Sequence, residues 1–106
     1  MTVADAIPGA KELVGKGVYR GVPANVPYPV RDRHAVVVGK PAECAAAARR
    51  VADAGWTVTV AAPQRCCGSS VVCAAGIEYL EAVVLRRVGS GRIEACNASA
   101  LFILER

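Results

Sequence analysis

The chain has 106 residues and a net charge of +4, with 54% hydrophobic and 21% charged residues. This length suits one domain with one core, and this composition excludes an intrinsically disordered chain. The arginines and lysines are scattered rather than gathered in one run, so the charge pattern predicts no nucleic-acid partner.

The sequence shows no targeting or membrane-spanning segment. Residues 1–15 lack the basic start and apolar stretch of a signal peptide, and no apolar run approaches the ~20 residues that span a bilayer. The cysteines are odd in number and irregularly spaced, which favours reduced thiols over a disulfide framework (Cys44, Cys66, Cys67, Cys73, Cys96). We therefore predict a cytoplasmic protein that makes no membrane contact.

Residues 1–33 are predicted to form an extended lead-in arm rich in proline and glycine. Ile7-Pro-Gly is a turn signal, and three later prolines exclude a helix (Pro23, Pro27, Pro29). Such a segment usually crosses the surface of another body, as a linker or as an arm that docks on a partner. Residues 34–106 are predicted to form the domain itself.

The domain is expected to open with a strand and a helix. Residues 34–38 predict a strand buried on both faces, because four apolar residues follow His34 without polar alternation. Pro41 suits the first turn of a helix, which is expected over 42–54 and ends before Gly55. One face of this helix is apolar at helical spacing (Cys44, Ala47, Ala48, Val51).

The remaining elements complete an α/β pattern. Trp56 to Ala62 predicts a second strand, and residues 71–88 predict a second helix from apolar positions at helical spacing (Val72, Ala75, Tyr79, Val83). Residues 92–96 and 100–105 predict a third and a fourth strand. The order β-α-β-α-β-β predicts a small Rossmann-like three-layer domain with a mainly parallel sheet: three parallel strands and a last strand of uncertain direction.

Two stretches resemble a known family. Residues 7–19 are Ile-Pro-Gly-Ala-Lys-Glu-Leu-Val-Gly-Lys-Gly-Val-Tyr, and residues 35–39 are Ala-Val-Val-Val-Gly. In this order and spacing they resemble the nicotinamide-binding domain of thioredoxin-reductase-like flavoproteins, which are FAD-dependent pyridine nucleotide-disulfide oxidoreductases. In that family a Pro-Gly-Glu-type turn and a Gly-Lys/Arg-Gly-Val stretch precede the domain. The resemblance extends to the final strand and implies a Rossmann-like fold with an NAD(P)H site.

The cofactor motif of that family is incomplete here. The fingerprint G-x-G-x-x-G/A falls on residues 39–44, where Gly39 keeps the tight turn and Cys44 is close to alanine in size. Pro41 replaces the second glycine and removes an N–H donor where a phosphate would bind. The end of the second strand, 62–64, supplies neither the acid that binds ribose in NAD sites nor the basic run of NADP-selective members. The resemblance implies cofactor contacts from five residues, and we predict weakened or lost NAD(P)H binding there (Gly39, Lys40, Ala42, Glu43, Arg65).

Other parts of the family's machinery are missing. The redox Cys-x-x-Cys pair would fall at Gly21 and Ala24, and no segment of the FAD-binding domain is in the chain. We therefore expect neither dithiol chemistry nor FAD on this chain alone. The resemblance implies a truncated relative, either an excised piece or a gene product that kept only this piece, and Met1 favours the second.

No catalytic residue can be assigned from the sequence. Adjacent Cys66 and Cys67 suit a vicinal disulfide, a soft-metal site or plain packing, but without a Cys-x-x-Cys pair or a histidine cluster we predict no metal. His34, with Asp32 nearby, is either a general base or a surface residue. Ser69-Ser70 lacks the G-x-S-x-G elbow of acyl-transfer enzymes.

Two classes of function stay open. In the first, the chain is the nicotinamide-binding part of an oxidoreductase whose flavin lies on a partner subunit. In the second, it is a stand-alone Rossmann-like protein repurposed as a non-redox enzyme or as a binding module for a small apolar molecule, in the old nucleotide cleft or at a dimer interface. A homodimer is expected in either case, because a truncated sheet leaves a bare edge beside the apolar strand Leu101–Leu104. The proline-rich arm or the last strand is the segment expected to be exchanged.

Overall fold

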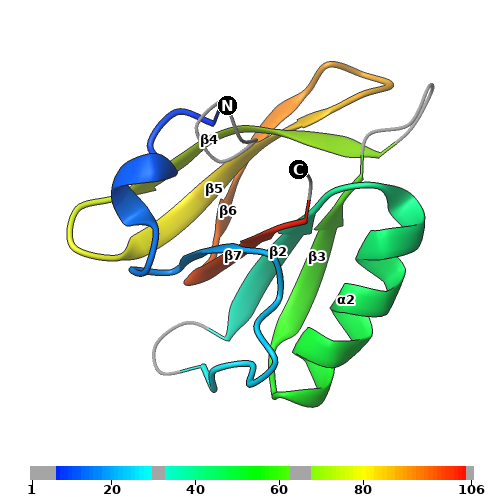
Figure 1. Ribbon diagram of the computed structural model, residues 1–106. Coiled ribbons are helices and arrows are strands. Elements are labelled where there is room, and N and C mark those ends of the chain that lie inside the picture. The colour runs from blue at the N-terminus through cyan, green and yellow to red at the C-terminus, as the bar shows by residue number, and fades with distance from the viewer. Residues whose placement is uncertain (1–6, 30–32, 63–67, 105–106) are drawn as a thin grey trace.

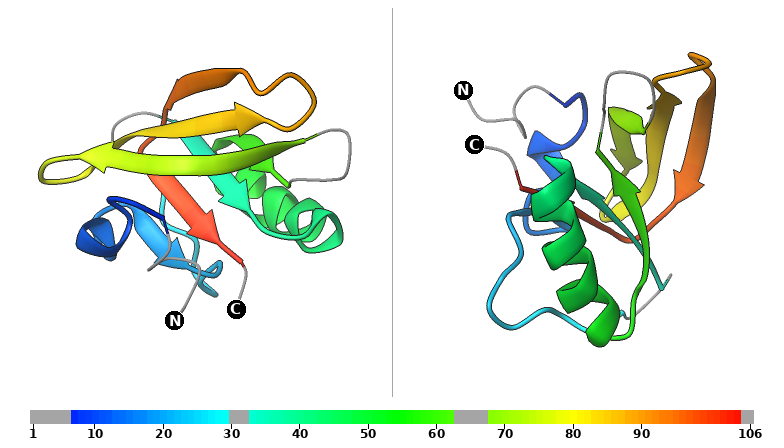
Figure 2. Two further views of the ribbon diagram at one scale, coloured as in Figure 1. Left: turned by 90° about the horizontal axis from the view of Figure 1, so that it is seen from above. Right: turned by 90° about the vertical axis from the view of Figure 1, so that its right-hand side faces the viewer.

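The computed structural model describes residues 7–29, 33–62 and 68–104. Three layers are stacked: a helix, a four-stranded parallel sheet in the order β1-β7-β2-β3, and a three-stranded antiparallel sheet in the order β4-β5-β6 (Figures 1 and 2). The Rossmann-like α/β fold class with a mainly parallel sheet is therefore confirmed. No helix within the described ranges has the length and apolar character needed to cross a membrane.

The elements follow one another along the chain in this order. They are a 3-10 helix η1 (Lys11–Leu13), β1 (Val18–Arg20), β2 (His34–Val38), α2 (Pro41–Asp53), β3 (Thr57–Ala61), β4 (Ser69–Gly76), β5 (Leu80–Arg87), β6 (Ile93–Asn97) and β7 (Ala100–Ile103).

The β2-α2-β3 unit forms as the sequence predicts. Helix α2 begins at Pro41, where the missing N–H is harmless, and its buried side chains are Cys44, Ala47 and Val51. Strands β2 and β3 run parallel, with His34 opposite Thr57 and Val38 opposite Ala61.

Burial on both faces explains the unbroken apolar run of β2. Val36 and Val38 pack into the core shared with the antiparallel sheet, beside Leu80 and Val83. Alternate residues of β2 and β7 instead pack under α2 (Ala35, Val37, Ala100, Phe102). Side chains alternate across a strand, so a central strand between two layers needs apolar residues at every position.

The predicted second helix over 71–88 is wrong. This region forms the antiparallel strands β4 and β5, joined through residues 77–79. The helical pattern depended on Tyr79, which is exposed, whereas burial along β5 follows the two-residue period of a strand at Val83 and Leu85. Adjacent β-branched pairs at Val71-Val72 and Val83-Val84 also favour strands.

The last two strands differ from the predicted arrangement. Strand β6 pairs antiparallel with β5, so the predicted third strand lies outside the parallel sheet. Strand β7 is parallel to both of its neighbours, β1 and β2, and therefore lies inside the sheet rather than at its edge. The described part of the lead-in arm supplies β1, and its side chains reach the core at Ile7, Leu13 and Val18.

Candidate functional site

The carboxyl ends of the four parallel strands lie together at one end of the sheet, which is where open α/β folds bind ligands. The turn after β2 lies there: Gly39 follows the strand, Lys40 is the N-cap of α2 and Pro41 is its first residue. The Gly39 amide donates to the carbonyl oxygen of Ala61 at 3.3 Å, so the turn is tied to the end of β3.

Four of the five predicted cofactor residues come together at this turn. Gly39 is buried, and Lys40, Ala42 and Glu43 are exposed around the start of α2. The fifth, Arg65, lies outside the described residues, as do Pro63, Gln64, Cys66 and Cys67, which follow β3 in the sequence.

Packing alone accounts for the glycine at 39. A Cβ atom added there would lie 2.9 Å from the Cβ of Leu104 and 3.6 Å from the Sγ of Cys44. The thiol of Cys44 is fully buried and donates weakly to the carbonyl oxygen of Val37, at 3.9 Å. The retained glycine is thus no sign of a working phosphate cradle.

Gly39→Ala is expected to lower the free energy of unfolding by about 1–3 kcal/mol, because the added methyl group overpacks the contact with Leu104. Urea denaturation followed by circular dichroism measures the loss. Ala42→Ser, an exposed change in the same turn, is the matched control and should stay within about 0.5 kcal/mol. Equal stability of the two variants would contradict the packing role of Gly39.

The other sequence candidates do not form a catalytic cluster among the described residues. His34 Nε2 is hydrogen-bonded to the hydroxyl of Thr59 and lies at the start of β2, at the opposite edge from Gly39. Ser69 and Ser70 lie within β4. The described ranges contain no group of three or more His, Cys, Asp or Glu side chains that could hold a metal ion.

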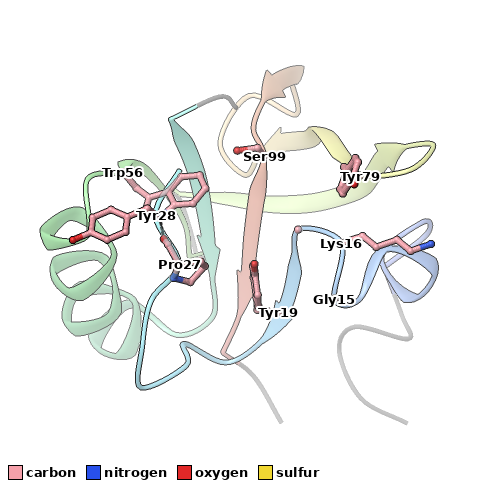
Figure 3. Close-up of a pocket in the computed structure, with 9 residues that line it drawn as sticks. Gly15, Lys16, Tyr19, Pro27, Tyr28, Trp56, Tyr79 and Ser99 are labelled. Carbon is pink, nitrogen blue, oxygen red and sulfur yellow. Dashed lines mark hydrogen bonds between the residues drawn. The ribbon is translucent and has the colours of Figure 1, made fainter. Parts of the chain in front are cut away.

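The structure adds a site that the sequence did not reveal, at the amino ends of the parallel strands. We call it the aromatic groove, a cavity of about 380 Å³ with the lining residues Gly15, Lys16, Gly17, Tyr19, Pro27, Tyr28, Trp56, Tyr79 and Ser99 (Figure 3). Four of the five aromatic residues of the chain line it. This is a size and a lining typical of small-molecule sites.

Two aromatic contacts fix the groove at one end and along its middle. The indole Nε1 of Trp56 donates to the carbonyl oxygen of Pro27 at 2.7 Å, which holds the Pro27-Tyr28 segment against the start of β3. The ring of Tyr19 stacks on that of Phe102, with centroids 5.0 Å apart and planes 16° apart. Both rings are thereby oriented before any ligand arrives.

A glycine sets the distance between the groove's middle and its other end. Gly17 has a φ of +116°, and a Cβ atom there would lie 2.7 Å from the Cβ of Leu80 and 2.8 Å from the oxygen of Ser99. The Leu80 amide donates to the carbonyl oxygen of Lys16 at 2.8 Å, which brings the β4–β5 connection and Tyr79 against the start of β1. Only a residue without a side chain permits this close approach.

A partial signal for the groove was present in the sequence. Gly17, Trp56 and Ser99 each directly precede a strand of the parallel sheet, so a correct topology would have placed all three at one edge. Tyr28 and Tyr79 reach the groove from irregular segments, whose path no sequence period describes.

These features define a small Rossmann-like domain, and solved structures of this fold can be named. The chain is similar to thioredoxin reductase from Streptococcus pyogenes MGAS5005, with a TM-score of 0.69 and 18% identity over 92% of this chain and 39% of that one. It is also similar to thioredoxin reductase from Giardia duodenalis, with a TM-score of 0.61 and 15% identity over 92% of this chain and 38% of that one. No protein-family model and no curated protein matches the sequence.

The similarity shows that this chain has a thioredoxin-reductase-like fold, which matches one part of each of those proteins. The chain spans about two fifths of the length of the two reductases. The structural similarity therefore supports the fold that the sequence resemblance implied. The activity of a whole reductase does not follow from this similarity.

Proposed function

We propose that the chain is a ligand-binding module built on a dinucleotide-binding scaffold, with weakened or lost NAD(P)H binding at the glycine turn. Its ligand is a small, largely apolar molecule held in the aromatic groove. The observation that carries the proposal is the convergence of Tyr19, Tyr28, Trp56 and Tyr79 on one cavity of about 380 Å³. The aromatic groove is neither of the two sites considered from the sequence, which were the nucleotide cleft at the glycine turn and a dimer interface.

The glycine turn offers a poor cradle for a pyrophosphate. Helix N-termini bind phosphates through unpaired N–H groups. The Gly39 N–H already donates to Ala61, and Pro41 has none. The carboxylate of Glu43 in the first helical turn adds a negative charge that repels a phosphate, and the cation that the described residues place in this turn is Lys40.

Calorimetric titration with NADH and with NADPH is expected to give dissociation constants above about 100 µM, which corresponds to a binding free energy less favourable than about −5.5 kcal/mol. Because Trp56 precedes β3, the five residues of β3 place its indole roughly 17 Å from the turn, so calorimetry suits this site better than Trp56 fluorescence. Pro41→Gly restores a donor and should tighten binding roughly tenfold, the effect of one charge-assisted hydrogen bond. Micromolar affinity of the unaltered protein would overturn the weakened-site proposal.

The same titration also tests the other candidate function, in which the chain is the nicotinamide-binding part of an oxidoreductase with a flavin-bearing partner subunit. The retained β2-α2-β3 unit and its turn at Gly39 favour that role. Tight NADPH binding would support it, and weak binding that Pro41→Gly improves would favour the repurposed module.

We also propose that the module self-associates through strand β3. Strand β7 is internal to the parallel sheet, so the apolar run at Leu101–Leu104 cannot offer the free edge expected from the sequence. Strand β3 is the outer strand at one side of that sheet, and its sequence Thr-Val-Thr-Val-Ala contains no charge and no proline.

A further inference from the structure

We propose that the aromatic groove is a site for a flat, uncharged aromatic molecule that carries a hydroxyl or amide group. This inference rests on the proposed function and names the ligand class of the same site. It follows from three features of the groove: the number of ring faces, the placement of charge and the position of the hydroxyl groups.

The ring faces are the first feature. Tyr28 is 78% exposed and Tyr79 is 54% exposed, although both are large side chains that bury favourably. Figure 3 shows Tyr28 beside Trp56 at one end of the groove, Tyr79 towards the other end and Tyr19 between them. A flat aromatic ligand stacks on such faces more favourably than a saturated molecule of equal size.

The placement of charge is the second feature. Lys16 is the one charged residue among the described residues that line the groove, and its amino group points away from the rings of Tyr28 and Trp56 (Figure 3). An ionised group bound beside Tyr28 and Trp56 would lose water without meeting an opposite charge, which makes its binding unfavourable. The groove therefore favours a neutral molecule.

Hydroxyl groups are the third feature. Ser99 lies in the middle of the groove, between the Tyr28 and Trp56 rings at one end and Tyr79 at the other (Figure 3). The tyrosine rings carry phenolic oxygens. A hydroxyl group has one donor and two acceptor sites, so it can hydrogen-bond a hydroxyl or amide group of a ligand in addition to a partner within the protein. The indole N–H of Trp56 is engaged by Pro27, so it orients the ring rather than the ligand.

Three probes of similar size separate these features: 2-naphthol is flat and neutral, 2-decalol is its saturated counterpart, and 2-naphthoate is flat and charged. Calorimetry measures their affinities, and the one indole N–H signal of the chain, from Trp56, locates binding by NMR. We expect 2-naphthol to shift this signal and to bind roughly tenfold or more tightly than either of the other probes. Equal binding of 2-decalol would overturn the aromatic requirement, and tighter binding of 2-naphthoate would overturn the preference for a neutral ligand.

Variants of Tyr28 test the stacking contact without threatening the fold, because this side chain is mostly exposed. Tyr28→Phe should retain 2-naphthol affinity within about threefold, and Tyr28→Leu should lose roughly fivefold or more, since leucine keeps apolar bulk but has no ring face. Ile93→Ala, an exposed apolar change on β6, should change nothing. Equal affinity of the Tyr28→Leu variant would overturn the stacking role.

Failure of the inference and failure of the proposed function give different results. If 2-decalol matches 2-naphthol while both shift the Trp56 signal, the groove is a site for apolar molecules in general and the proposed function stands. If no probe shifts that signal up to its solubility limit, both are wrong.

Discussion

Phe102→Ala is expected to lower the free energy of unfolding by about 3–5 kcal/mol, the usual loss for a fully buried phenylalanine. The side chain is completely buried in the middle of β7, between β1 and β2, and packs in the core beneath α2. Its ring also supports Tyr19, so the substitution removes a stacked pair as well as a core side chain. Urea denaturation followed by far-ultraviolet circular dichroism measures the change.

A substitution on a true outer strand is the matched control. Ile93 lies on β6, is 55% exposed, and its change to alanine should alter stability by no more than about 0.5 kcal/mol. If the Phe102→Ala variant lost less than about 1 kcal/mol, the complete burial of Phe102 between β7 and α2 would be contradicted.

The β2-α2-β3 unit was predictable because every local signal in it agrees. A proline suits its place at the start of α2, a glycine follows the helix, and the apolar positions match a helical period (Pro41, Gly55, Cys44, Ala47, Val51). These signals act over a few residues, so they do not depend on the rest of the fold.

The region 71–88 was not predictable by the same means because its period is ambiguous. Register shifts interrupt β4 between Val71 and Cys73 and between Ala75 and Gly76, and each shift breaks the two-residue alternation of a regular strand. The interrupted pattern then imitates helical spacing. Pairing with β5 decides in favour of strands, and that pairing is a tertiary interaction.

The position of β7 depends on contacts that are remote in sequence. Val18 pairs with Leu101, and Ala35 pairs with Ala100, so the last strand enters between two strands that precede it by most of the chain. No local pattern encodes such an insertion. The same long-range arrangement creates the aromatic groove, which is why the glycine turn was foreseen from the sequence and the groove was not.

Among the four outer strands that the described residues form, β3 alone combines an uncharged sequence with a register free of shifts. Strand β1 has only three residues, and β6 carries Glu94, which pairs with Arg87 and Arg92 at 3.7 and 3.4 Å. Strand β4 is interrupted by register shifts, and its Ala74 amide donates to Pro8 of the lead-in. Short length, charges, bulges and covering segments all prevent strand-to-strand association, whereas an uncharged β-branched edge invites it.

Val60→Lys is therefore expected to convert a dimer into a monomer at high micromolar concentration. Val60 lies on β3 and is 42% exposed, so a lysine there charges the proposed interface without entering the core. Light scattering should give twice 11.0 kDa for the unaltered protein and 11.0 kDa for the variant, with unchanged circular dichroism. Ile93→Lys places the same charge on β6 and should leave the dimer intact.

A second copy is the partner that we propose for β3, because the strand can pair antiparallel with itself. A register centred on Thr59 aligns Val58 with Val60 and Thr57 with Ala61, so β-branched side chains meet across most of the interface. The two parallel sheets would then join into one continuous sheet, with the aromatic groove of each copy at the amino ends of its own strands. A monomeric mass for the unaltered protein would contradict the self-association, and dissociation by Ile93→Lys instead of Val60→Lys would place the interface on the antiparallel sheet.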